Sequence, residues 1–331
     1  MKALVVGLRG PAVTEVAKPI AKPNEVLVQV RACGLNRADL GVAAGHSHGA
    51  IGGAGTVVGM EWAGVVEQVG SQVSGQGSGR GSEIQVGDRV MGSGAGAFAE
   101  YAVTDWGRVM PIPSDALSFE QAATLPVALQ TMHNALVTVG AMQPASAVLI
   151  QGASSGVGLM AMQIARLRGA ALVIGSSTNA ARRARLSEFG AHMAIDTQDP
   201  DWVDQVLKAT DGRGVDLIID QVSGHLVNDN LKATRVLGKI VNVGRLGGTR
   251  AEFDFDLHAL RRISYVGVTF RTRSIEEIRT INALMRADLG DAVAGGQLSL
   301  PIDRVFALDD ALEALAYMKA NQHLGKVVLR V

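Results

Sequence analysis

The sequence of 331 residues has little cysteine, few aromatic residues and no excess of charge of either sign. Its one thiol, Cys33, forms no internal disulfide and builds no cysteine-rich zinc site, which excludes an extracellular disulfide scaffold. Lys and Arg (31) balance Asp and Glu (31), so nothing in the charge favours nucleic acid or an anionic membrane as a partner. No stretch reaches the ~18 apolar residues of a membrane helix, and the N-terminal apolar stretch is too short for a secretory signal. We therefore expect a cytoplasmic protein.

Glycine, in contrast, is abundant, with 40 residues. The first third of the chain reads as short strands at residues 4–7, 25–32, 61–69, 89–91 and 97–103. Two stretches rich in glycine or serine, 41–59 and 74–85, are predicted to be surface loops. A chain of this length suits two domains rather than one core.

From residue 147 the pattern becomes strand, helix, strand, helix. Short apolar runs at 147–152, 171–176, 192–196, 215–220, 239–244 and 264–270 are typical of strands covered on both faces. Helices are predicted between them, including 156–169 and 180–190, which ends at a glycine. The alternation predicts an α/β fold with a doubly wound parallel sheet. We place this α/β domain at 123–270, inserted into a β-rich domain made of 1–122 and 271–331.

The turn after the first of these strands is built from small residues and leads straight into a helix. Such a turn lets backbone amides approach a pyrophosphate at the helix N-terminus, where the helix dipole favours an anion. The spacing is not a strict GxGxxG, and a close-packed turn without a ligand is the alternative. The strand–helix units that follow favour a dinucleotide. The predicted contacts are Gly152, Ser154, Ser155, Gly156, Val157 and Gly158.

The end of the second strand indicates which dinucleotide binds. A site selective for NAD usually has Asp or Glu there, whereas this strand ends with Ser176 and Ser177, and Arg182 and Arg183 follow. Hydroxyls and a guanidinium suit a 2′-phosphate. The alternative is a capped helix with a solvated basic turn. We predict NADPH, bound in part by Ser176, Ser177 and Arg182.

The chain resembles the zinc-independent quinone oxidoreductases and enoyl reductases of the medium-chain dehydrogenase/reductase superfamily. The motifs that carry the resemblance run nearly from end to end: RACGLNRADL, GMEWAGVVEQVG, GDRV, GAFAEYAV, AATLPVALQTMHNAL, GASSGVG and NQHLGKVVL. It implies a GroES-like β domain, a Rossmann domain, and a homodimer. In the zinc alcohol dehydrogenases of the superfamily, the metal ligands fall at Asn36, at Met60 and near Val127, none of which suits Zn²⁺. We therefore predict no metal.

The resemblance also implies roles for individual residues. Asn36 lies near the nicotinamide as a hydrogen-bond donor, with Asp39 one turn further on, although Asn36 alternatively caps a helix. A tyrosine that serves many relatives as proton donor is replaced here by Ser47, which leaves His46, His48 or water as the donor. Further cofactor contacts are implied for Thr131, Gly244, Arg245, Leu246, Thr269, Phe270, Arg271, Asn321 and Lys326.

These features predict an NADPH-dependent, metal-free oxidoreductase. Without a metal, conjugate addition of hydride is easier than alcohol oxidation, because the developing charge spreads into an enolate. The expected substrate is an enone or enal, reduced at its carbon–carbon double bond, with a quinone as the alternative acceptor. A cofactor-binding protein with a structural or RNA-binding role is the alternative outside enzymes.

Overall fold

The computed structural model describes residues 1–49, 51–73, 84–113 and 116–331. The chain divides into two units: residues 1–127 with 270–331 (unit 1), and residues 128–269 (unit 2). The first boundary lies five residues beyond the position expected from the sequence, within the helix α3 (Pro126–His133), and the second lies one residue before it. The insertion of one unit into the other is the organisation that the strand pattern predicts.

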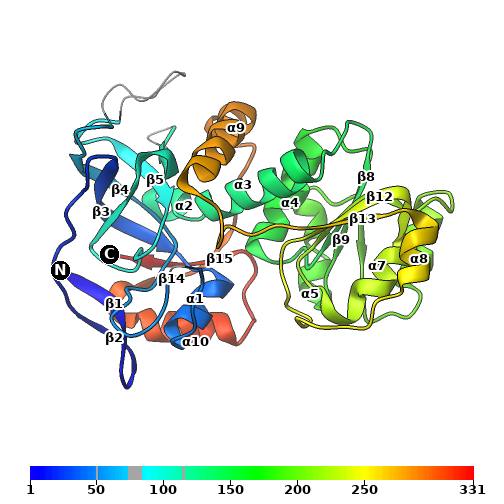
Figure 1. Ribbon diagram of the computed structural model, residues 1–331, viewed down its shortest axis with the longest axis horizontal. Helices are drawn as coiled ribbons and strands as arrows, with labels where there is room; N and C mark the ends of the chain where they lie inside the picture. Colours follow the sequence, from blue (N-terminus) through cyan, green and yellow to red (C-terminus); the bar gives the residue numbers. More distant parts are fainter. Residues whose placement is uncertain (50, 74–83, 114–115) are drawn as a thin grey trace. The chain divides into compact units, whose positions relative to one another are not determined.

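Unit 1 is rich in β-structure. Its strands are β1 (Lys2–Gly7), β2 (Gly10–Glu15), β3 (Glu25–Gly34), β4 (Glu61–Val69), β5 (Arg89–Ser93), β6 (Tyr101–Asp105), β7 (Val109–Pro111), β14 (Ile302–Ala307) and β15 (Lys326–Arg330). Its helices are α1 (Arg37–Ala43), α2 (Phe119–Ala122), α9 (Ile275–Ala294) and α10 (Ala311–Lys319). Within the described residues, the order β14-β15-β3-β4-β5-β7 forms the main sheet, and β6 also pairs with β3. Figure 1 shows α1 beside α10, with which it is in contact.

The strand order of unit 1 joins distant parts of the sequence. Strand β15, near the C-terminus, pairs antiparallel with β3, where Val328 faces Gly34. On the other side of β3, Gly34 faces Glu61 of β4. The start of β4, the end of β3 and the start of β15 therefore meet at one place, and Trp62 and Phe98 are fully buried in the core of this unit.

Unit 2 consists of strands and helices in alternation. Its strands are β8 (Ala147–Gln151), β9 (Leu172–Ser176), β10 (Met193–Ile195), β11 (Val215–Asp220), β12 (Thr234–Asn242) and β13 (Ser264–Gly267). Its helices are α4 (Gly156–Leu167), α5 (Ala180–Arg183), α6 (Trp202–Ala209), α7 (Val227–Ala233) and α8 (Phe255–Arg261), of which α7 and α8 are in contact (Figure 1).

All neighbouring strands of the sheet in unit 2, every residue of which is described, are parallel. Their order is β10-β9-β8-β11-β12-β13. Counted from β8, this is the order 3-2-1-4-5-6 of a doubly wound dinucleotide-binding sheet. The order in which successive strands are added reverses between β8 and β11, although these two strands are parallel. Ligands of such sheets bind at the carboxyl ends of the strands near that reversal.

Two segments differ from the sequence prediction. The helix expected over 180–190 is split into α5 and a short 3₁₀ turn at Leu186–Phe189, because Leu186 turns inward and is fully buried. The predicted glycine stop is confirmed, since Gly190 has φ +100°. The loop expected over 41–59 begins inside α1, which continues to Ala43, and Val58 at its other end is buried. Of the second predicted loop, residues 74–83 lie outside the described part of the chain.

Candidate active site

The turn between β8 and α4 has the geometry of an anion cradle. Gly152 has φ +70°, a conformation that glycine adopts at little cost. Ser155 caps α4, because its hydroxyl accepts a hydrogen bond from the backbone N–H of Gly158 at 3.1 Å. A Cβ on Gly158 would lie 2.7 Å from the Cα of Ala153, so only glycine allows this close packing of turn and helix. The N-terminal end of α4, a helix of 12 residues, therefore lies next to the point where the strand order reverses, and its backbone N–H groups are directed away from the sheet.

A buried polar network holds this turn in place. The hydroxyl of Ser176 donates to Oε1 of Gln151 at 2.6 Å and accepts from the N–H of Gly152 at 3.0 Å. Gln221 donates through Nε2 to the carbonyl of Gln151 at 3.1 Å and accepts from Ser155 Oγ at 2.8 Å. The one hydroxyl hydrogen of Ser176 is therefore donated to Gln151, next to the turn. Direct contact of Ser176 with a cofactor stays a prediction.

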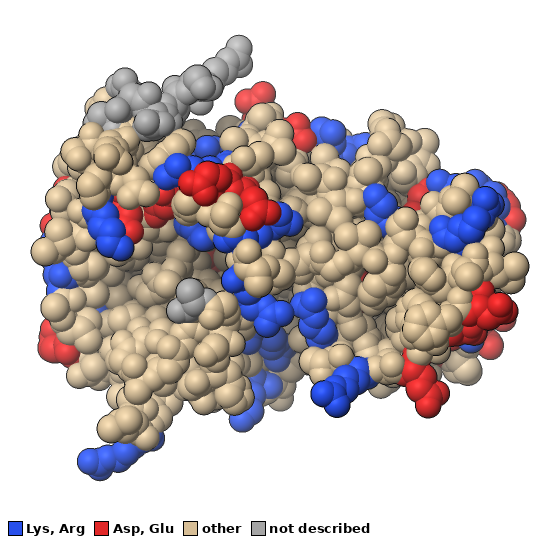
Figure 2. All heavy atoms as spheres, in the orientation of Figure 1, with Lys and Arg blue, Asp and Glu red and all other residues tan. Residues whose placement is uncertain are grey.

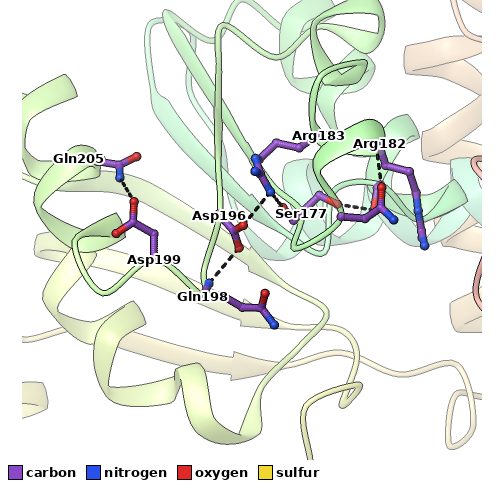
Figure 3. Close-up of polar contacts among 9 residues, drawn as sticks. Ser177, Arg182, Arg183, Asp196, Gln198, Asp199 and Gln205 are labelled. Atoms are coloured by element: carbon purple, nitrogen blue, oxygen red, sulfur yellow. Dashed lines mark hydrogen bonds and ion pairs between the residues drawn. The ribbon is translucent and has the colours of Figure 1, made fainter.

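The next residues along the chain form the predicted phosphate site (Figure 3). Ser177 lies after β9, and its hydroxyl donates to Ser154 Oγ at 3.0 Å. Arg183 points toward Asp196, with 2.8 Å between Nη1 and Oδ2, and it also donates to the carbonyl of Ser177 at 2.7 Å. Arg182 extends away from Asp196 in Figure 3. Of the two neighbouring arginines, Arg183 is thus held by an acid of unit 2.

The loop after β12 approaches the same edge of the sheet. The N–H of Gly244 donates to the carbonyl of Asp220 at 3.1 Å, and the N–H of Leu246 donates to the carbonyl of Gln221 at 3.2 Å. The side chain of Leu246 is exposed. The structure therefore gathers the predicted residues at 152–158, 176–177 and 244–246 at the carboxyl ends of β8, β9 and β12. Thr131 lies on α3, and Thr269 follows β13.

In unit 1, Asn36 belongs to a buried charged network. Lys326 forms an ion pair with Oε1 of Glu61, and its ammonium also donates to Asn36 Oδ1 at 3.0 Å. Asn36 donates through Nδ2 to the same carboxylate oxygen of Glu61 at 2.8 Å. The side chains of Glu61 and Lys326 are 0% and 5% exposed, whereas Asn36 is half-buried. Lys326, predicted from the resemblance to contact the cofactor, thus makes these contacts within unit 1.

Asp39 is next to this network, in the first turn of α1. Its Oδ2 accepts a hydrogen bond from the N–H of Asn36 at 2.7 Å. Its Oδ1 is buried and has no hydrogen-bond partner among the described residues. Burial raises the pKa of Asp39 to about 7, and the nearby Glu61 adds to this, while the Asn36 N–H and Lys326 oppose it. Asp39 is therefore a carboxyl group that can hold a proton near neutral pH.

The two candidate histidines lie after α1. His46 is exposed, and His48 is half-buried in a short backbone bridge with Ile51. Burial, with a smaller contribution from Arg271, lowers the pKa of His48. A Cβ on Gly49 would lie 2.9 Å from the carbonyl oxygen of Arg271, so this segment packs closely against the chain that follows Phe270. The lowered pKa means that His48 is mostly neutral at pH 7, which weakens it as an acid.

Comparison with known proteins agrees with this geometry. Residues 22–114 match the family described as the alcohol dehydrogenase GroES-like domain, and residues 156–287 match the family described as zinc-binding dehydrogenase. The structure of the CurK enoyl reductase is similar over 99% of this chain and 98% of that one, with a TM-score of 0.84 and 26% identity. The chain belongs to the medium-chain dehydrogenase/reductase superfamily. The predicted fold class, a GroES-like domain with a Rossmann-like parallel sheet, is confirmed.

Two further members show the range of this superfamily. A quinone oxidoreductase of Pseudomonas syringae pv. Tomato DC3000 is 26% identical, with a TM-score of 0.84, over 100% of this chain and 99% of that one. A phenolphthiocerol/phthiocerol polyketide synthase of Mycobacterium tuberculosis is 30% identical over 319 residues, which are 96% of this chain and 14% of that protein. The chain thus spans a small part of that relative. These relationships identify it as an oxidoreductase of the superfamily, in the branch of quinone oxidoreductases and enoyl reductases.

The name of the second matching family raises the question of zinc. The three positions at which metal ligands are expected from the superfamily hold an amide (Asn36), a thioether (Met60) and an apolar side chain (Val127). The backbone N–H of Val127 donates to Oε2 of Glu61 at 2.9 Å. Cys33 is fully buried, and burial raises the pKa of its thiol. In the parts of the chain that the structure describes, no three His, Cys, Asp or Glu residues gather as metal ligands do. This donor set does not fit Zn²⁺.

Some residues that shape the site were missed in the sequence. Gln151, Asp220 and Gln221 are all buried, and Gln221, which follows β11, joins β8 to the glycine turn through the carbonyl of Gln151 and the hydroxyl of Ser155. Asp220 accepts hydrogen bonds from the N–H groups of Val222 and Ser223. Burial raises the pKa of Asp220, and these hydrogen bonds partly oppose the effect. The available signal was a polar residue at the carboxyl end of an otherwise apolar parallel strand, because ligands of such sheets bind there.

Proposed function

We propose that this protein is an NADPH-dependent reductase that works without zinc and delivers hydride to the β-carbon of an α,β-unsaturated carbonyl compound. The observation that carries the proposal is Asn36, which stands at the position of a zinc ligand and is held there as a hydrogen-bond donor by Glu61 and Lys326. A quinone is the alternative acceptor.

In this mechanism the residues of each unit have separate tasks. The turn at Gly152–Gly158 binds the pyrophosphate through backbone N–H groups, and Ser177 with Arg182 binds the 2′-phosphate. The nicotinamide, when bound, supplies the hydride. Asn36 donates a hydrogen bond to the carbonyl oxygen, where negative charge develops as the enolate forms. Proton return to the α-carbon then comes from His46, from His48 or from water.

An acceptor panel tests this proposal. NADPH oxidation is measured with matched enones, enals and quinones, and we expect kcat/KM to be at least about tenfold higher for the enone or enal. A preference of that size for quinones would favour the alternative. Tight NADPH binding without turnover of any acceptor would favour a non-catalytic, structural or RNA-binding role instead.

The preference for NADPH depends on Arg182. We expect Arg182→Ala to raise KM for NADPH about tenfold, since a charged hydrogen bond to phosphate contributes roughly 1.5–3 kcal/mol. KM for NADH, which has no 2′-phosphate, should stay within about twofold. Arg185→Ala is the matched control, because Arg185 is exposed and pairs with Glu188. Equal losses with both cofactors would contradict this assignment.

The proton donor can be tested at the two histidines. We expect the His46→Ala/His48→Ala variant to lose about 10²-fold in kcat if either side chain returns the proton. The pH dependence of kcat, measured across neutral pH, should lose its alkaline limb at the same time, because a proton donor acts only in its protonated form. Unchanged turnover and an unchanged pH profile would leave water as the donor.

The assembly and location are also proposals. Among the described residues, strand β13 lies at the edge of its sheet and pairs with β12 alone, so its other side could pair with a strand of a second copy. Phe255 and Leu260, on the neighbouring α8, are 75% and 74% exposed. We propose a homodimer, to be tested by light scattering.

No helix of the described residues is long and apolar enough to cross a membrane. Figure 2 shows both acidic and basic side chains on one face, and a cytoplasmic location stays a prediction.

A further inference from the structure

The charged network of unit 1 contains one amide whose orientation matters for the proposed reaction. Asn36 offers a carbonyl oxygen on one side and an NH₂ group on the other. Its Oδ1 faces the Lys326 ammonium at 3.0 Å, and its Nδ2 faces the Glu61 carboxylate at 2.8 Å. An ammonium only donates hydrogen bonds and a carboxylate only accepts them. Rotating the amide by half a turn would therefore set NH₂ against the ammonium and oxygen against the carboxylate.

The two charges thus permit one orientation of the amide. The pair itself is fixed by two strands, because Glu61 begins β4 and Lys326 begins β15. The second carboxylate oxygen of Glu61 is held by the N–H of Val127 at 2.9 Å. A Cβ on Gly34 would lie 2.7 Å from Oε1 of Glu61, so glycine at this position leaves room for the carboxylate.

Of the three residues of the network, Asn36 is the most accessible to a small molecule. Glu61 is fully buried and Lys326 nearly so, whereas Asn36 is half-buried. One hydrogen of its NH₂ group is used on Glu61, and the other has no acceptor in the described part of the chain. This spare N–H is the donor that a substrate oxygen can use.

We propose that Lys326 and Glu61 are positioning residues that lock the side-chain amide of Asn36, so that its spare N–H is presented to the substrate carbonyl. The proposal rests on the proposed function, and it gives Lys326 a different role from a direct cofactor contact. A lysine in contact with the cofactor would act on cofactor affinity. A lysine that positions Asn36 would act on the chemical step.

Three variants separate these roles in the enzyme with NADPH and an enone. We expect Lys326→Met to lower kcat about tenfold, since part of the benefit of a pre-organised donor is lost. KM for NADPH should stay within about twofold. Lys326→Gln keeps an N–H donor at this position and should restore part of kcat. Arg279→Met is the control, because it removes a partner from another ion pair of unit 1, with Asp105, and it should leave kcat unchanged.

A second measurement needs no turnover. The chain has nine asparagines, so selective ¹⁵N-amide labelling gives few side-chain signals. In the wild type we expect the Asn36 NH₂ proton that is bound to Glu61 to be shifted downfield of its partner on the same nitrogen, and in Lys326→Met we expect the separation of the two signals to narrow to that of a solvated amide. Lys326→Gln should keep the wider separation.

The outcomes distinguish this proposal from the proposed function. A wild-type enzyme that reduces no acceptor would overturn the proposed function, while unchanged Asn36 signals in Lys326→Met would overturn the locking of the amide. If Lys326→Met is folded and keeps its kcat, or if it loses no more than Arg279→Met, the positioning role is wrong. If it raises KM for NADPH strongly at unchanged kcat, Lys326 is a cofactor contact.

Discussion

Glutamine in place of Glu61 is expected to lower the free energy of unfolding of unit 1 by about 3–5 kcal/mol, the usual cost of removing one partner from a buried ion pair. Glutamine has the same shape and still accepts hydrogen bonds from Asn36 and Val127. It leaves the Lys326 ammonium buried, however, with 5% of its side chain exposed and no compensating charge from residue 61. The loss therefore reports on the charge rather than on packing.

Urea titration followed by tryptophan fluorescence measures this effect, since Trp62 and Trp106 lie in unit 1. Glu67→Gln is a matched control on the same strand, because Glu67 pairs with Lys18 at a surface where both side chains are about 40% exposed. Such pairs contribute roughly 0–1 kcal/mol. The double variant Glu61→Gln/Lys326→Met should cost less than the sum of the single variants. Additive losses, or equal losses for Glu61 and Glu67, would contradict a tightly coupled buried pair.

This pair shows where prediction from sequence reaches its limit. Glu61 and Lys326 each stand at the start of an apolar strand, where a charged side chain is usually solvated. Their contact depends on β15 returning to pair with β3, across 265 positions of the chain. Neither strand pattern contains that information. The resemblance placed Lys326 in the predicted site but could not indicate that its charge is directed to Glu61.

Local patterns were more informative in unit 2. The apolar runs predicted β8, β9 and β11 closely, because parallel strands are buried on both faces and their sequences show it. The single helix predicted after β9, over 180–190, was wrong in detail, since the structure splits it. The buried position of Leu186 and the contact of Arg183 with Asp196 arise from tertiary packing. Helix propensity alone cannot anticipate such contacts.

The turn at 152–158 was predictable for a different reason. Its small residues serve the backbone rather than a side-chain contact, and glycine at Gly158 is required by the atoms of Ala153 nearby. The polar side chains that hold the turn, Gln151 and Gln221, were not predicted because a single polar residue at a strand end has several uses. The sequence thus predicts the turn, and the structure shows the side chains of Gln151 and Gln221 that hold it in place.

Asparagine in place of Asp39 is expected to stabilise the protein at alkaline pH and to do so much less in acid. Burial raises the pKa of Asp39 to about 7 in the folded chain, against 3.8 as its ordinary value. Between these values the folded state holds a proton that the unfolded state has lost, so wild-type stability falls as the pH rises from about 4 to about 7. Above pH 7 the loss is complete and amounts to about 4 kcal/mol. The amide of the variant does not titrate and avoids this loss.

The measurement is the difference in unfolding free energy between Asp39→Asn and wild type at several pH values, which cancels all other titrating groups. The difference should grow in favour of the variant from about pH 4 to about pH 7 and then stay constant. Glu120→Gln provides a comparison of opposite sign. Burial acts to raise the pKa of Glu120, but its hydrogen bonds and Arg330 outweigh this and lower it. That variant should lose ground as the pH rises, because the paired carboxylate stabilises the folded state. A flat difference for Asp39→Asn would mean that Lys326 stabilises its charged form fully, and Asp39 could then hold no proton at neutral pH.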